Sequence, residues 1–162
     1  MVFWVPLIAY ALVALFVAVS LARAPRPLPP HSVATALMRG IFLFPAGLMG
    51  LWGALGHTVF AAQAAAAIGW APSPFQFEVA MANLAIGVTG IVAAYYPNWG
   101  FRLATALATA CFLGGAAVGH LVQIGTTGNL ATGNAGPILY TDVLTPLALL
   151  VLLAITPRTQ RG

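Results

Sequence analysis

Five long apolar runs constrain this chain more than any other feature of its sequence. A helix of about 20 apolar residues is long enough to cross the roughly 30 Å hydrocarbon core of a bilayer. Only 5% of the 162 residues are charged, whereas about a quarter are charged in a typical soluble domain. The sequence therefore predicts an all-α transmembrane protein whose connections hold little beyond short turns. The expected spans are Val2–Leu21, Ala36–Phe60, Phe75–Tyr96, Gly100–Ile124 and Pro137–Ile155.

The basic residues are all arginines, and they gather beside the first loop, the third loop and the C-terminus. The second and fourth loops contain neither lysine nor arginine. By the positive-inside rule, the arginine-bearing segments are expected in the cytoplasm and the N-terminus outside. The net charge of +4 is thus read as a signal for topology in a bacterial inner membrane, and no nucleic-acid partner is expected. The topology residues are Arg23, Arg26, Arg39, Arg102, Arg158 and Arg161.

A shift of 63 residues brings several landmarks of the chain into register. Arg39 falls on Arg102 and His57 falls on His120, with 18 positions between arginine and histidine in each case. Both halves start at a cytoplasmic arginine, so they run in the same direction. The sequence therefore predicts a duplicated helical hairpin.

The predicted bundle consists of the last four helices, related by a pseudo-twofold axis along the membrane normal, with the first span packed on its outside. The boundaries are 1–35 for the first helix and its Pro/Arg-rich loop, 36–98 and 99–157 for the two repeats, and 158–162 for the tail. Small residues allow membrane helices to approach closely. The glycines expected at such contacts are Gly47, Gly50, Gly53, Gly56, Gly115 and Gly119.

The only acidic residues of the chain, Glu78 and Asp142, fall where a predicted span begins. Each is preceded by a histidine, His57 or His120, that falls near the end of the previous span. Ionisable residues at membrane depth are costly and often mark ion or proton pathways. The repeat places all four at one depth, which predicts a polar site near the outer boundary of the membrane.

Imidazole and carboxylate groups together suit a transition metal ion, and helical bundles build such sites from facing helices. We therefore interpret the four residues as ligands of a transition metal or as proton carriers. Transport or sensing fits better than catalysis, because no nucleophile is evident. Gln123, Tyr140 and Thr145 are expected to be supporting polar residues of this site.

Other interpretations stay open at this point. His57 and His120 could be the axial ligands of a b-type haem, since a small residue precedes each by one turn. The four residues could also be ordinary interfacial groups, with the acids favoured by helix N-termini. The chain could then be an accessory subunit of a larger membrane complex, or a homo-oligomer, with the lipid bilayer as its main partner. The polar, glycine-rich segment 125–137 is either a connector or a loop folded back over the bundle.

Three strings carry a resemblance to a known family: FPAGLMGLWGALGH at 44–57, SPFQFEVAMANLAIG at 73–87 and GNAGPILYTD at 133–142. They resemble a family of small prokaryotic integral membrane proteins without an assigned activity. The resemblance covers about residues 38–153. It implies a multi-span membrane protein and no particular catalytic or binding residues.

Overall fold

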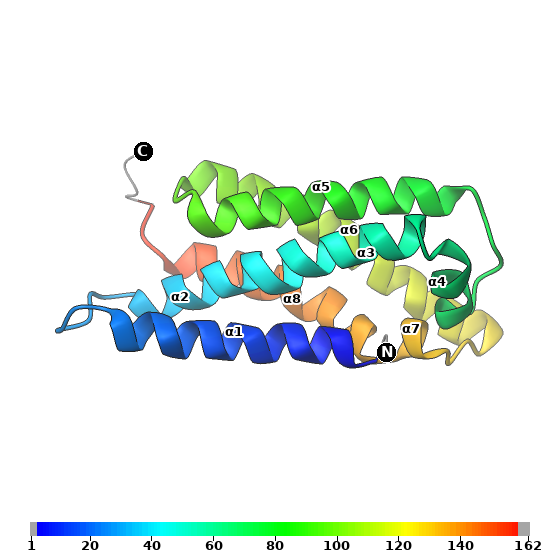
Figure 1. Cartoon of the computed structure of the whole chain (residues 1–162), viewed down its shortest axis with the longest axis horizontal. Helices are drawn as coiled ribbons and strands as arrows, with labels where there is room; N and C mark the ends of the chain where they lie inside the picture. Colours follow the sequence, from blue (N-terminus) through cyan, green and yellow to red (C-terminus); the bar gives the residue numbers. More distant parts are fainter. Residues whose placement is uncertain (1–2, 159–162) are drawn as a thin grey trace.

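The computed structural model describes residues 3–158, and in that range the chain is built from helices with no strand. Five of the helical segments are long and apolar enough to cross a membrane, in agreement with the predicted number of spans. They lie roughly side by side (Figure 1). Their length and composition are those of a multi-pass helical membrane protein. The elements are α1 (Trp4–Arg23), α2 (Ser32–Ile41), the π-helix η1 (Phe42–Leu48), α3 (Met49–Thr58), α4 (Ala61–Ile68), α5 (Phe75–Tyr95), α6 (Trp99–Thr127), α7 (Thr132–Ala135) and α8 (Pro137–Ile155).

The second span, Ser32–Thr58, changes its helical pitch in the middle. Pro45 lies inside it and cannot donate a backbone hydrogen bond, and its ring would clash with the preceding turn of a regular α-helix. The turn around Pro45 is a π-helix, a local widening that removes this conflict. The span therefore continues through the proline as α2, η1 and α3.

The span through η1 and α3 packs on α5 at a seam of glycines. A Cβ atom added to Gly50 would lie 2.7 Å from the backbone nitrogen of Gly87, and one added to Gly90 would lie 2.9 Å from the carbonyl oxygen of Phe42. One added to Gly47 would meet Ile91 Cγ1 at 2.9 Å. The two backbones are thus in direct contact, as small residues permit in membranes.

Two arginines bind the C-terminal end of α5, where helix carbonyls lack partners. Arg39 donates from Nε to the Ala94 carbonyl at 2.9 Å, and Arg102 donates from Nε to the Ala93 carbonyl at 2.9 Å. Arg102 is 2% exposed. Cations are favoured at this end of a helix, so these residues hold three spans together as well as marking the charged end of the protein.

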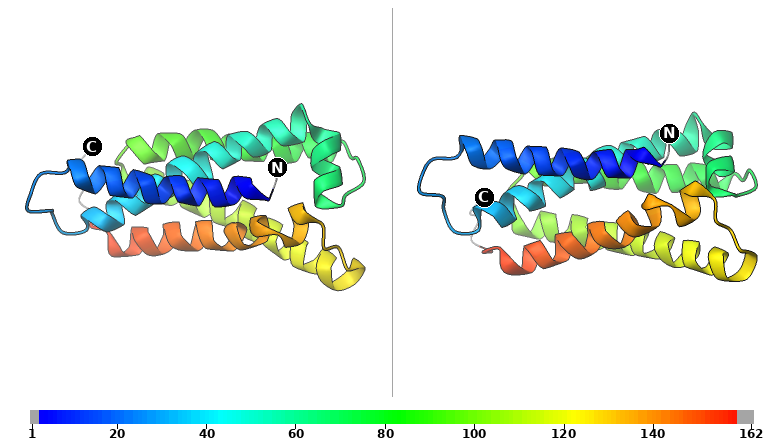
Figure 2. Two further views of the ribbon diagram at one scale, coloured as in Figure 1. Left: turned by 60° about the horizontal axis from the view of Figure 1, so that its bottom comes forward. Right: turned by 90° about the horizontal axis from the view of Figure 1, so that it is seen from below.

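The second hairpin consists of α6 and α8, which pack on each other and are joined by α7 (Figure 2). The first helix, α1, packs on α2, η1 and α8, and most of its surface faces outward. α1 begins and α8 ends at opposite ends of the molecule. The helices of each predicted repeat do pair with each other, whereas the duplication and its pseudo-twofold axis stay predictions.

The two ends of the molecule differ in packing. The buried cluster that includes Met38, Phe42 and Leu149 fills the half nearest the arginines. The other half is covered by α4 and α7, two short helices in loops for which we expected only turns (Figure 1). The alanine-rich composition of α4 favours a helix, and Gly69 ends it with a left-handed φ of 79°. This covered half contains the candidate site.

Candidate functional site

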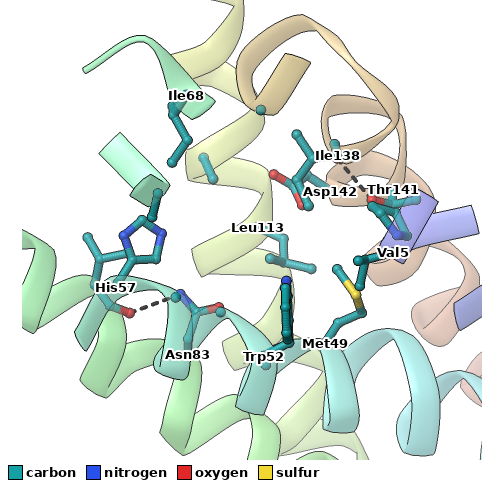
Figure 3. A pocket seen from close by; sticks show the side chains of 18 of the residues that line it. Val5, Met49, Trp52, His57, Ile68, Asn83, Leu113, Ile138, Thr141 and Asp142 are labelled. Carbon is teal, nitrogen blue, oxygen red and sulfur yellow. Dashed lines mark hydrogen bonds between the residues drawn. The ribbon is translucent and has the colours of Figure 1, made fainter. Parts of the chain in front are cut away.

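A cavity of about 640 Å³ lies among the spans at the end of the molecule away from the arginines. Residues of α1, the second span, α4, α5, α6 and α8 contribute to its wall, and most of them are apolar. His57 on α3 and Asp142 on α8 face it from opposite sides, with Trp52 and Leu113 between them in the view of Figure 3. His120 on α6 also lines it. The cavity therefore contains three of the four residues that the sequence singled out.

His120 is fixed by a buried amide. Its Nδ1 lies 2.7 Å from Oδ1 of Asn134, which is fully buried on α7. Asn134 Nδ2 donates to the Asn129 carbonyl at 2.8 Å, so the amide oxygen is the atom directed at the ring. An amide oxygen only accepts hydrogen bonds. His120 Nδ1 therefore carries a hydrogen and donates it.

The other ring nitrogen of His120 faces a carboxylate. Nε2 lies 3.7 Å from Asp142 Oδ2, beyond the roughly 2.7–3.2 Å of a direct hydrogen bond. In a neutral ring with its hydrogen on Nδ1, Nε2 has a lone pair, which does not attract a carboxylate. His120 and Asp142, 7% and 4% exposed, are electrostatically complementary when one more proton lies on either member of the pair. This arrangement can hold and release a proton.

His57 also lies beside a buried amide. Its Nδ1 lies 3.1 Å from Oε1 of Gln76, which is 4% exposed at the start of α5. With Nδ1 donating to that oxygen, Nε2 has the lone pair. Histidines that bind metals or protons are commonly oriented through the opposite ring nitrogen.

Glu78 does not join the other three residues, which corrects our prediction. It is exposed and does not line the cavity. Successive helical positions are 100° apart, so residues two positions apart point to nearly opposite sides. Gln76 faces inward, and Glu78 therefore faces outward. With one inserted residue the repeat aligns Glu78 with Asp142, but the residue beside the first histidine is Gln76.

A shared metal centre of the four residues is also not formed. In the range 3–158, no group of three or more His, Cys, Asp or Glu residues lies close enough together to hold a metal ion. The spread of the three cavity residues over opposite walls is the physical reason, because ligand atoms must lie about 2 Å from the ion.

The three supporting residues have different surroundings. Thr145 is 1% exposed and hydrogen-bonds Tyr10 of α1 at 2.9 Å, which ties α1 to the cavity wall. Gln123 accepts from Trp70 Nε1 at 3.0 Å and from Asn129 at 2.9 Å, so it joins the covering loops rather than the site. Tyr140 is 71% exposed and points away.

The glycines also separate into two groups. A Cβ added to Gly53 would lie 2.7 Å from Asn83 Oδ1, and Gly47 and Gly50 lie at the α5 seam. Gly56, Gly115 and Gly119 line the cavity, and an added Cβ there would meet no atom within 4 Å. Their predicted role in helix packing is therefore wrong for this structure: they leave space instead of closing it.

Sequence reasoning missed the amides that orient the histidines. Gln76 had a usable signal, because it is a polar residue on the face of α5 that also carries the buried Ala80. Asn134 had no such signal apart from its position in an uncharged polar loop. The loop that contains Asn134 folds back over the helices, and the Asn134 side chain reaches His120.

Comparison with known proteins places the chain in one family. No curated protein and no solved structure matches it. The family match extends over residues 3–162, nearly the whole chain, and the family has no assigned activity. The lack of an assigned activity agrees with the resemblance drawn from the sequence, and the five apolar helices fit the membrane protein that this resemblance implies. The chain is a member of DUF6790, a family of unknown function.

Proposed function

We propose that the protein transports or senses a small molecule that enters the cavity, and that His120 and Asp142 bind the proton that controls its occupancy. One observation carries the proposal: the pair lies in a cavity among membrane-spanning helices, at 3.7 Å, with His120 held in one tautomer. A charge in such a place is costly. If the pair had no function, apolar side chains could fill the same space without that cost.

The chemistry of the pair supports proton binding over metal binding. Asn134 occupies Nδ1 of His120, and the remaining nitrogen and the carboxylate are complementary when they share one proton. A metal centre is not part of the proposal, because the described residues offer no set of three ligands. Proton carriers need no such set.

The proposed orientation places the cavity end outside and the arginine end in the cytoplasm. Arg39 and Arg102 at the end of α5 support it, as do the loops at the cavity end, which carry no lysine or arginine. The cavity would then exchange protons with the outer solution.

Infrared spectroscopy can test the proton site, because the sequence holds just two side-chain carboxyl groups. In dodecyl maltoside micelles, which add no carboxyl group, E78Q retains Asp142 and D142N retains Glu78, so each carboxyl band can be assigned. Two titratable groups titrate as a unit when their interaction is worth more than about one pH unit in the titration midpoint. We expect His120→Gln to move the titration midpoint of Asp142 by about that amount or more.

The matched control is the same His120→Gln change in D142N, where the midpoint of the exposed Glu78 should not move. Far-ultraviolet circular dichroism checks that each variant is folded. An Asp142 band whose titration ignores His120 would contradict the proposal.

A further inference from the structure

We infer that the molecule bound in the cavity is a lipophilic organic cation, with its positive charge at Asp142 and its apolar body against the surrounding wall. This inference rests on the proposed function and names the ligand class of the same site. It starts from the charge of the cavity. Asp142 is the single Asp, Glu, Lys or Arg among the residues that line it.

The titratable groups that face Asp142 come from three other elements. They are His120 on α6, Tyr10 on α1 and, across the cavity, His57 on α3. Asn134, the partner of His120, is neutral. When the pair of His120 and Asp142 loses its shared proton, the site therefore has a net charge of −1. A buried charge needs a counter-charge, and no lysine or arginine lines the wall to supply one.

The apolar wall selects the rest of the ligand. Its aromatic members include Trp52, Phe60, Trp70 and Phe112, and aromatic faces attract cations. The volume of about 640 Å³ is within the range of about 300–1,000 Å³ found for sites of drug-sized molecules. Gly56, Gly115 and Gly119 leave part of this space open.

Anionic and neutral ligands fit the site less well. An anion would meet Asp142 with no arginine nearby, because Arg23, Arg26, Arg39, Arg102 and Arg158 lie at the other end of the described chain. A neutral apolar molecule would leave the deprotonated carboxylate unpaired. An organic cation can neutralise the carboxylate with its charge and contact the apolar wall with the rest of its surface. The cation and the proton then exclude each other at Asp142.

Tetraphenylphosphonium and tetraphenylborate test this, because they share a shape and differ in the sign of their charge. Binding is measured by equilibrium dialysis on nanodiscs that contain the protein, with empty nanodiscs subtracted for lipid partitioning. We expect wild type to bind the cation at least about tenfold more tightly than the anion. D142N should weaken cation binding by about tenfold or more, a loss of about 1.4 kcal/mol.

E78Q is the matched control, since it removes the other acid of the chain from an exposed position. It should leave cation binding unchanged. Gly119→Leu is a second variant that keeps Asp142 and fills the cavity, and it should also weaken binding. Equal binding of the two ions, or unchanged cation binding in D142N and Gly119→Leu, would overturn the inference.

The two proposals can fail separately. If the cation does not bind but Asp142 and His120 still titrate as a unit, the ligand class is wrong and the proton site stands. If that coupled titration is missing, the proposed function is itself wrong.

Discussion

Glycine has two opposite structural roles in this protein. At some positions it allows two helices to pack closely, and at others it leaves space open in the cavity. Gly87 lies at the seam with α3, where an added Cβ would be 2.8 Å from the backbone nitrogen of Leu51. Gly119 lies at the cavity, where an added Cβ would meet nothing within 4 Å. Both are helical residues one turn or more from a helix end. Their substitution by alanine should therefore separate packing from cavity formation.

We expect Gly87→Ala to destabilise the protein by about 1–3 kcal/mol, the usual cost of overpacking. The backbone of α3 must move to admit the methyl group, since the nearest atom is not a flexible side chain. Gly119→Ala should be neutral or slightly stabilising, because alanine favours a helix over glycine. Reversible unfolding in mixed detergent micelles measures both. Equal stability of the two variants would contradict the assigned seam.

The candidate site could be predicted in part at the level of residues. The cost of charge in an apolar chain identified His57, His120 and Asp142, and these three do line one cavity. Glu78 was included on the same ground, as the other acid at the start of a span, although helical periodicity turns it outward. The amide partners depend on the tertiary position of α7 and of the start of α5. Local sequence does not determine those positions.

At the scale of elements, apolar length was sufficient to predict the spans. The last one, Pro137–Ile155, agrees with α8 at both ends, and the third differs by one residue. The second begins at Ser32 instead of Ala36, because polar Ser32 and Thr35 continue the helix toward the interface. The helices α4 and α7 were not predicted. Each has few residues, and helices this short depend on packing more than on their own propensity.

The whole molecule is divided into a packed, arginine-bearing half and a hollow half with the acids. This division is the physical basis of the proposed orientation, since arginines resist transfer across the membrane. It also keeps positive charge away from the cavity. The proposed orientation and the proposed ligand class thus rest on one charge distribution.

Cysteine labelling of intact cells tests the orientation. In a Cys111→Ala background, Ala71→Cys places a thiol in the loop before α5, and Pro30→Cys places one in the loop before α2. A membrane-impermeant maleimide should label the first from outside and the second only after the cells are permeabilised. The reverse pattern would contradict the proposed topology.

The exchange of a proton for a cation at Asp142 is the central claim, and proton release on binding measures it most directly. Tetraphenylphosphonium is added to protein in weakly buffered dodecyl maltoside micelles with a pH indicator, at a pH where the infrared band shows Asp142 protonated. We expect about one proton released per cation bound in wild type and E78Q, and none in D142N. A cation that binds to wild type without releasing a proton would contradict the account.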